Sequence, residues 1–429
     1  MLAVQAERTP GLPCVLGGCH PVTGMSSSPR PLDERPDPAT VHLDERDRRL
    51  LEAVDDAETL GLLFDLIARR SENPPGNELS CAKALSAWLE DRGVACELDE
   101  VLPGRPNLYA SVGGPGPTLV LCGHLDTVPA GRGWTHEPSQ ATLADGLVYG
   151  RGACDMKAGL AAMAGAIVAV ASSGVSLRGS VALHGVIDEE VGSAGARKAA
   201  DEHPGDWVIV TEPTDCEVLS MGNGQANFEI VFQGKAVHSS HPEDGRNAIS
   251  DAAALVRLIE EETHRLALYP FQGIGPATYS VCLIEGGRGG STVADRCQLT
   301  VDRRILPSES LEGAEARIVQ LIDELAAKRP GLSCQMSRSV AFPPLRGTGS
   351  GYLARALAGA VGDLTGNGGG EKGMRFATDA AWYEAAGCEA VVFGPGDVGV
   401  AHEPDERVSV DTLYVATRAL ALCCGRMLA

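Results

Sequence analysis

Apolar residues follow two different spacings along this chain, and each spacing predicts a different kind of sheet. Continuous apolar runs, typical of strands that are buried on both faces, occur at residues 118–122, 181–187 and 207–210. Apolar residues at helical spacing occur around these runs, at residues 50–67, 82–89, 158–172 and 194–202. Strands that alternate with helices predict an α/β domain with a mostly parallel central sheet flanked by helices.

A strictly alternating pattern replaces these runs after about residue 220. At residues 227–232, one face of the predicted strand carries Phe228, Ile230 and Phe232, and the other face carries Asn227, Glu229 and Val231. Residues 297–302 alternate in the same way. Together with helices predicted at residues 248–266 and 311–328, these half-buried strands indicate a small α+β (ferredoxin-like) domain with helices on one face of its sheet.

The buried-strand pattern returns after about residue 337, so the smaller domain is expected to be inserted into the larger one. A strand is predicted at residues 389–393 and a helix at residues 411–424. We divide the chain into an N-terminal extension and three further parts, at residues 1–46, 47–219, 220–337 (the inserted domain) and 338–429. The extension is rich in Pro, Ser and charged residues, so we expect it to be disordered, and Met25 is an alternative start.

Composition narrows the class of protein. The chain has 429 residues and a net charge of −21, which disfavours binding to nucleic acid or to an anionic membrane surface. No apolar run is long enough to cross a membrane. The 13 cysteines have no regular spacing, so we expect reduced thiols and a cytoplasmic protein. Residues 16–19 faintly resemble a lipoprotein cleavage site, but no basic segment precedes them.

Candidate chemistry begins directly after the first buried strand, in the segment GHLDTVP at residues 123–129. Ligands of α/β proteins bind at the carboxyl ends of parallel strands. His124 and Asp126 are two residues apart, so an extended backbone points both side chains the same way, as a metal ligand and the carboxylate that orients it. Taken alone, such a pair is more often a surface hydrogen bond.

Two acidic segments add to this pattern. Asp155 lies in a Gly-rich turn at residues 150–159, where a carboxylate repels phosphate and suits a cation, although a helix N-cap is the plainer interpretation. Residues 188–190 are three consecutive carboxylates at the end of a buried strand. Such a cluster is unfavourable without a cation, and a solvated acidic turn is the alternative.

Two later strand ends complete a possible ligand set. Glu212 follows the strand at residues 207–210, and His402 follows the strand at residues 389–393. Zinc and other divalent ions accept two histidines and three carboxylates as ligands, here His124, His402, Asp155, Glu190 and Glu212. Two divalent ions would be neutralised by the three carboxylates and one bridging hydroxide. The joint placement therefore predicts a two-metal centre.

These motifs, in this order, resemble the di-zinc metallopeptidase family of acetylornithine deacetylase, succinyl-diaminopimelate desuccinylase, aminoacylase and carboxypeptidase G. The resemblance covers about residues 50–425 and implies a zinc-peptidase-like catalytic domain with an inserted lid and dimerisation domain. By matching position, it implies that one metal ion is held by His124 and Glu212, the other by Glu190 and His402, and that Asp155 bridges the pair.

The resemblance also implies roles for residues that are not ligands. Asp126 would orient His124, and Glu189 would be the general base that takes a proton from the metal-bridging water. His238, in the segment GKAVHSS at residues 234–240, would reach into the site of a partner subunit and stabilise the oxyanion. This role implies a homodimer that forms through the inserted domain.

Four further residues stand at positions that bind substrate in the family: Arg304, Ser291, Asn247 and Gly394. Arg304 would bind a substrate carboxylate. Ser291 stands where the family carries an Asn-x-x-Pro-Asp stretch, so a lid contact that bears on specificity departs from the pattern here. The C-terminal motifs resemble acetylornithine deacetylase more than the desuccinylase.

We therefore expect hydrolysis of the amide bond of a small N-acyl amino acid, as in acetylornithine deacetylase, with two Zn²⁺ ions, or with Co²⁺ or Mn²⁺ in their place. A dipeptidase or carboxypeptidase on the same centre is the alternative enzyme, acting on a peptide-like substrate. A catalytically inactive relative that serves as a metal-dependent binding or scaffold protein is the alternative outside enzymes. The presence of Glu189 beside the complete ligand set argues against this last alternative.

Overall fold

The computed structural model describes residues 43–368 and 372–429. The expectation of disorder concerns the N-terminal extension, whose residues 1–42 lie outside the described part. Among the described residues, no helix is both long and apolar enough to cross a membrane. The cysteines in the same part of the chain are all free thiols.

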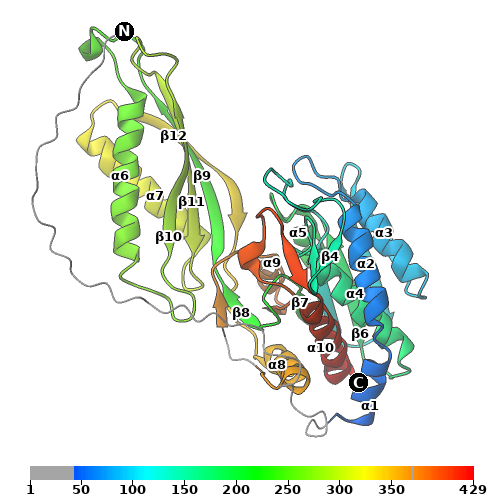
Figure 1. The fold of residues 1–429 in the computed structure, drawn as a ribbon. Helices are drawn as coiled ribbons and strands as arrows, with labels where there is room; N and C mark the ends of the chain where they lie inside the picture. Colours follow the sequence, from blue (N-terminus) through cyan, green and yellow to red (C-terminus); the bar gives the residue numbers. More distant parts are fainter. Residues whose placement is uncertain (1–42, 369–371) are drawn as a thin grey trace, which may run out of the picture. The chain divides into compact units, whose positions relative to one another are not determined.

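The larger domain is built on an eight-stranded sheet in the order β1-β2-β6-β3-β7-β14-β8-β13 (Figure 1). These strands are β1 (Cys96–Leu102), β2 (Arg105–Gly113), β3 (Thr118–His124), β6 (Ser180–Val186), β7 (Trp207–Val210), β8 (Leu219–Gly222), β13 (Lys372–Met374) and β14 (Glu389–Val392). Neighbours among β6, β3, β7 and β14 are parallel, whereas β1 and β2 join one side as antiparallel strands. The prediction of a mostly parallel central sheet is confirmed.

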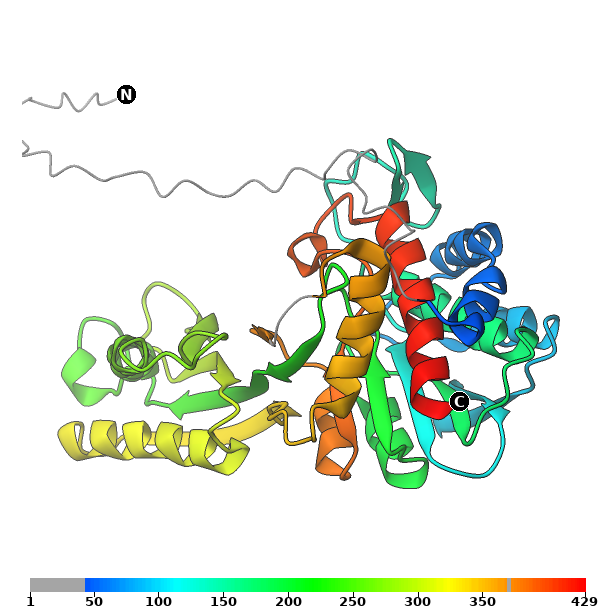
Figure 2. The same cartoon turned by 90° about the horizontal axis from the view of Figure 1, so that it is seen from below.

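Helices cover both faces of this sheet because its strands carry apolar residues on both faces. Leu119 and Leu121 of β3 pack into one core, and Val120 and Cys122 pack into the other. The first core is covered by α1 (Glu45–Glu52), α2 (Asp56–Ala68), α3 (Leu79–Glu90), α4 (Lys157–Ser172), α8 (Tyr352–Thr365) and α10 (Val410–Leu428). The second is covered by α5 (Ala194–Glu202) and α9 (Ala380–Ala385). Figure 2 shows α8 and α10 side by side, and they are in contact.

The small residues of α4 let this helix approach the sheet closely, next to the strand ends that carry the candidate ligands. A Cβ atom added at Gly159 would lie 2.1 Å from the carbonyl oxygen of Thr211, so only glycine fits there. Thr211 directly precedes the candidate ligand Glu212. Packing of α4 therefore fixes the backbone on which that ligand stands.

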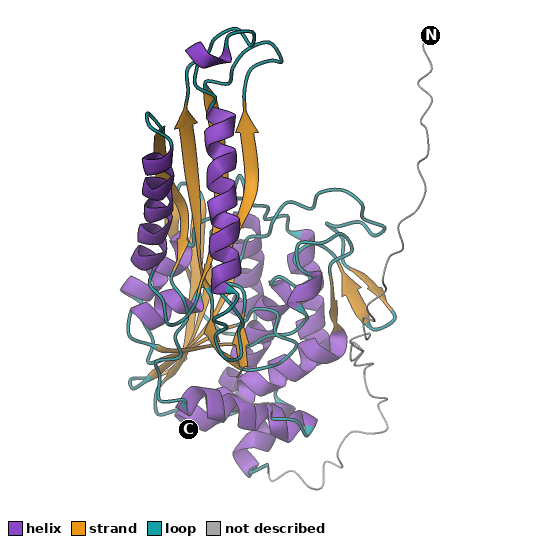
Figure 3. Cartoon of the chain, turned by 90° about the vertical axis from the view of Figure 1, so that its left-hand side faces the viewer, coloured by secondary structure: helices purple, strands orange, loops and turns teal. Residues whose placement is uncertain are grey.

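The second sheet is four-stranded and antiparallel, in the order β10-β11-β9-β12. Its strands are β9 (Gly224–Gln233), β10 (Thr278–Gly286), β11 (Arg296–Ile305) and β12 (Ser333–Phe342). Two long helices, α6 (Ala248–Leu266) and α7 (Leu311–Lys328), run along the strands (Figure 3). Their core contains the predicted inward residues Phe228, Ile230, Phe232, Cys297, Leu299 and Val301. The inserted α+β fold is confirmed.

Several short elements were not predicted from the sequence. They include the hairpin of β1 and β2, a three-stranded sheet of β15 (Arg407–Ser409), β5 (Leu147–Tyr149) and β4 (Thr142–Ala144), and the 3-10 helices η3 (Pro242–Asp244) and η4 (Val398–Val400). Strand β1 contains three acidic residues and is nowhere fully buried, so it has no apolar run to detect. The three-residue strands are too short to show a period.

Candidate metal centre

Four parallel strands of the large sheet end at the same edge, and each is followed by candidate ligands. Strand β3 ends at His124, β6 is followed by the acidic turn 188–190, β7 by Glu212, and β14 by the loop that carries His402. Asp155 lies in the turn before α4. Residues separated by up to 278 positions are therefore neighbours, because the strands that carry them are hydrogen-bonded side by side.

The ligand atoms form two overlapping groups. His124, Asp155 and Glu212 make one group, and Asp155, Glu190 and His402 make the other, with the ligand atoms of each group within 4.8 Å of one another. Asp155 belongs to both. Its Oδ1 lies 3.1 Å from His124 Nε2 and its Oδ2 lies 3.2 Å from His402 Nε2. A carboxylate that offers one oxygen to each group has the geometry of a bridge between two cations.

The charge state of these residues indicates that cations belong at the site. Burial raises the pKa of the Glu212 carboxyl, and one Glu212 oxygen is buried without any hydrogen-bond partner. Hydrogen bonds to Asp155 and Glu190 raise the pKa of His402 to about 10. Without cations, protons on the histidines supply the positive charge that the carboxylates require. The donor set and the unpartnered oxygen fit two divalent ions.

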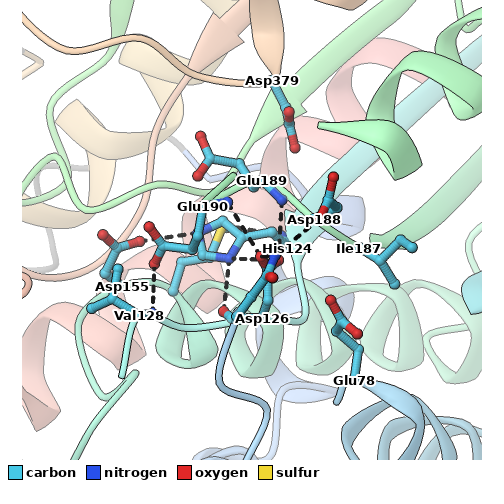
Figure 4. Close-up of polar contacts among 12 residues, drawn as sticks. Glu78, His124, Asp126, Val128, Asp155, Ile187, Asp188, Glu189, Glu190 and Asp379 are labelled. Carbon is cyan, nitrogen blue, oxygen red and sulfur yellow. Dashed lines mark hydrogen bonds and ion pairs between the residues drawn. The ribbon is translucent and has the colours of Figure 1, made fainter. Parts of the chain in front are cut away.

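Glu189 lies next to the ligand Glu190 but faces the cavity in front of the centre, so it is free for another role. Its side chain lines a cavity of about 530 Å³ together with Asp155, Glu190, Glu212 and His402. Figure 4 shows its carboxylate directed away from Asp126, which contacts only its main chain. Burial raises the pKa of the Glu189 carboxyl well above its ordinary value. A carboxylate with this placement can accept a proton from a molecule bound in the cavity.

Asp126 holds the acidic turn as well as the histidine. Its Oδ1 accepts a hydrogen bond from the Glu189 amide and its Oδ2 accepts one from the Glu190 amide, both at 3.2 Å (Figure 4). His124 Nδ1 lies 2.9 Å from the main-chain oxygen of Asp126 and 3.6 Å from its Oδ1. The main chain of Asp126 therefore orients His124 more closely than its carboxylate does.

A buried polar network supports this turn from behind, and sequence reasoning missed it. Asp188 has a φ of 72°, a left-handed conformation that is uncommon for a residue with a side chain. Its Oδ1 accepts hydrogen bonds from Asn73 at 3.0 Å and Arg105 at 2.9 Å. Arg105 also donates two bonds to Glu78, which is fully buried. Hydrogen bonds thus hold the conformation that places Glu189 and its neighbours.

The turn that carries Asp155 has its own support in Glu406, which is fully buried. The Glu406 carboxylate accepts hydrogen bonds from the amides of Gly152 at 3.0 Å, Cys154 at 2.8 Å and Asp155 at 2.9 Å. Its charge is paired with Arg151 at 2.5 Å. Glu406 lies in the motif that follows His402, but no spacing rule assigned it this role. The peptide bond between Asp155 and Met156 is cis.

The predicted substrate-binding residues are distributed unevenly. Arg304 lines the same cavity as the metal ligands, and its Nε donates to Asp302 at 2.9 Å. Asn247 is instead the N-cap of α6, and Ser291 accepts a hydrogen bond from the Ser239 amide through its main chain. Gly394 accepts main-chain bonds from the neighbouring loop. His238 is exposed and bonds Ser240 at 2.7 Å. These four residues do not line the cavity within the described chain.

Comparison with known proteins agrees with this geometry. The pattern of peptidase family M20/M25/M40 matches residues 120–425. An acetylornithine deacetylase from Myxococcus xanthus is 32% identical over 359 residues, which are 79% of this chain and 90% of the relative. A deformylase of N-formyl-4-amino-5-aminomethyl-2-methylpyrimidine from Bacillus subtilis is 26% identical over 395 residues, which are 85% of this chain and 93% of the relative.

A solved structure supports the fold. The crystal structure of a dinuclear metal-binding M20 peptidase from Bacillus subtilis has a TM-score of 0.65 at 17% identity and covers 87% of this chain and 98% of its own. The relatives that match by sequence cleave amide bonds in different compounds, so they agree on the bond but not on the substrate. Because the family pattern spans most of the chain and the two ligand groups lie inside it, this chain belongs to peptidase family M20/M25/M40 and is an enzyme that hydrolyses amide bonds.

Proposed function

We propose that this enzyme removes the acyl group from a small N-acyl amino acid, using two divalent ions that are Zn²⁺ in the native state. The observation that carries the proposal is the pair of ligand groups that share Asp155, beside Glu189 in a cavity that Arg304 also lines. A cavity of about 530 Å³ lies within the range of small-molecule sites, roughly 300–1,000 Å³. The acyl amide sits at the centre, and the amino-acid carboxylate sits at Arg304.

Glu189 carries out the proton transfers in this proposal. Bound divalent ions would polarise the amide carbonyl and lower the pKa of water. A carboxylate oxygen of Glu189 accepts a proton from the attacking water and delivers it to the nitrogen of the leaving amine.

Arg304 is placed to recognise a carboxylate. Its Nε is held by Asp302, which leaves the terminal guanidinium nitrogens free to face the cavity. Guanidinium and carboxylate groups pair through two parallel hydrogen bonds, which fixes orientation as well as adding affinity. A free α-carboxylate is common to N-acyl amino acids and to dipeptides, so Arg304 does not separate these two classes.

We also propose that the enzyme is a homodimer formed through the inserted domain. Strand β10 is an edge of its sheet and exposes Leu283 and Ile284, whose exposed fractions are 45% and 50%. An exposed apolar edge strand favours pairing with a second chain. His238 lies on the same domain but does not line the cavity of its own subunit. In a dimer, His238 of one subunit would reach the site of the other subunit and stabilise the oxyanion there.

The cytoplasm is the compartment that we propose, because the described cysteines are all free thiols. Separation of cell fractions and detection of the enzyme with an antibody would test this placement. Recovery of the enzyme from culture medium would contradict it.

A substrate panel tests the proposed activity. The zinc-loaded enzyme is assayed on a series of N-acetyl amino acids, on the same amino acids with N-formyl and N-succinyl groups, and on dipeptides with the same C-terminal residue. We expect kcat/KM to be highest for an N-acyl amino acid and to vanish when a chelator removes the ions. Higher kcat/KM on the dipeptides would instead establish the peptidase alternative.

A further inference from the structure

The cavity in front of the metal centre is lined by both apolar and polar residues. Beyond the ligands and Glu189, the residues that line it are mostly apolar and include Val191, Val340, Phe342, Phe376 and Val398. The polar ones are the amides Gln225 and Asn227 and the cation Arg304. Apart from these three polar residues, the wall that receives the rest of the substrate is therefore apolar.

No carboxylate in this cavity is available to a substrate cation, as far as the described residues go. The acidic residues that line it are Asp155, Glu190 and Glu212, which are the metal ligands, and Glu189, which moves the proton. Asp302 is not one of the lining residues and is paired with Arg304. An ammonium group that leaves water without a partner is strongly disfavoured, whereas a hydrocarbon chain gains from the same transfer.

Two of the apolar residues stand beside the reacting centre and are unusually exposed. Val191 follows the ligand Glu190, and Val398 lies in η4, four residues before the ligand His402. Their exposed fractions are 44% and 40%. Large apolar side chains that are exposed at the wall of a cavity indicate that an apolar part of a ligand covers them.

We infer that the amino-acid part of the substrate has an uncharged, apolar side chain, such as that of leucine, norleucine or phenylalanine. The inference rests on the proposed deacylase function and deepens it. It also separates this enzyme from its acetylornithine-cleaving relative, because ornithine carries an ammonium group to which the described lining offers the amide side chains of Gln225 and Asn227 but no carboxylate beyond the candidate ligands and Glu189. Arg304 would bind the α-carboxylate of both kinds of substrate in the same way. The side chain of the amino acid is therefore what distinguishes them.

A matched pair of substrates tests the inference. N-acetyl-norleucine and N-acetyl-ornithine have side chains of equal length that end in a methyl group and in an ammonium group, respectively. We expect kcat/KM on the norleucine compound to be higher by about 100-fold, through differences in transition-state binding of the side chain. Equal or higher kcat/KM on the ornithine compound overturns the inference and leaves the deacylase function standing. Hydrolysis of neither compound, nor of their N-formyl and N-succinyl counterparts, overturns both.

A variant tests whether the apolar wall causes the preference. Val398→Glu places a carboxylate beside the centre at a position that is already exposed, so the fold is expected to tolerate it. We expect the norleucine-to-ornithine ratio to fall by at least about tenfold. Val319→Glu is the matched control, because Val319 is 40% exposed on α7 and does not line the cavity. A ratio that is the same in both variants would show that this wall does not select the side chain.

Discussion

Asp155 belongs to both candidate ligand groups, and the turn that carries it is held from the other side by Glu406. The Glu406 carboxylate accepts hydrogen bonds from three main-chain amides of this turn and forms an ion pair with Arg151. All of these groups are buried or nearly buried. Arg105, Asn73 and Asp188 do the same for the acidic turn that carries Glu190. The candidate ligands are therefore positioned by a layer of hydrogen bonds in the absence of ions. Such layers raise metal affinity because they reduce the reorganisation that binding requires.

Glu406→Gln is expected to weaken metal binding without touching a ligand. Glutamine keeps an acceptor oxygen but removes the charge that pairs with Arg151, and loss of one partner of a buried pair costs about 3–5 kcal/mol of stability. We expect zinc affinity to fall by about 10–100-fold, together with a lower melting temperature. Zinc titration and thermal denaturation measure both. Glu243→Gln serves as the control, because the Glu243 side chain is 70% exposed.

The roles of these supporting residues could not be predicted from the sequence, whereas the grouping of the five candidate ligands could. The ligands follow apolar strands, so their position in the fold is visible as a local pattern. Asn73 and Asp126 are 53 residues apart, and Cys154 and Glu406 are 252 apart. Nothing local marks such pairs, since a single Asn or Glu has the same sequence context whether it is buried or exposed. Only the folded chain brings them together.

The predicted bounds of helices and strands are correct where apolar residues recur through the whole element. Helices α5, α6 and α7 and strand β7 have the predicted bounds, because their apolar positions repeat over the whole element. The hairpin of β1 and β2 was not predicted. Strand β1 has no apolar run of its own, and β2 is held in place by its pairing with β6. Edge elements depend on their neighbours, so local spacing indicates them poorly.

Strand β10 is the element that bears on assembly. Lysine at Ile284 would place a charge on the exposed edge, and charged residues on an edge strand oppose pairing with another sheet. We expect Ile284→Lys to be a monomer in light scattering, with metal content unchanged and activity lost along with His238 from the partner. Val319→Lys, an exposed substitution on α7, should remain a dimer. A dimer of unchanged mass for Ile284→Lys would contradict the proposed interface.

At the scale of the whole molecule, a chain with a net charge of −21 concentrates part of that charge at one sheet edge. Two divalent ions would offset only a small share of the total, but they would neutralise the site where the carboxylates meet. Protons take their place when the ions are absent. Metal binding and proton binding are therefore coupled in this enzyme.

This coupling predicts that metal binding releases protons at pH 7. The pKa of His402 in the metal-free protein is raised to about 10 by its hydrogen bonds to Asp155 and Glu190, so at pH 7 the ring is protonated. A histidine ring binds a metal ion in its neutral form, so metal binding releases that proton from His402. We expect zinc affinity to increase from pH 7 towards pH 10. Calorimetric titration in two buffers of different ionisation enthalpy counts the protons, and a count of zero would contradict the assigned protonation.

We propose that five residues hold two ions and that a sixth, Glu189, moves the proton. The most direct test is to measure metal content and turnover together in Glu189→Gln, which keeps the size of the side chain and removes the base. We predict two bound ions per chain, as in the unaltered enzyme, with kcat lower by about 10²–10⁴-fold. Normal turnover with both ions bound would contradict the account.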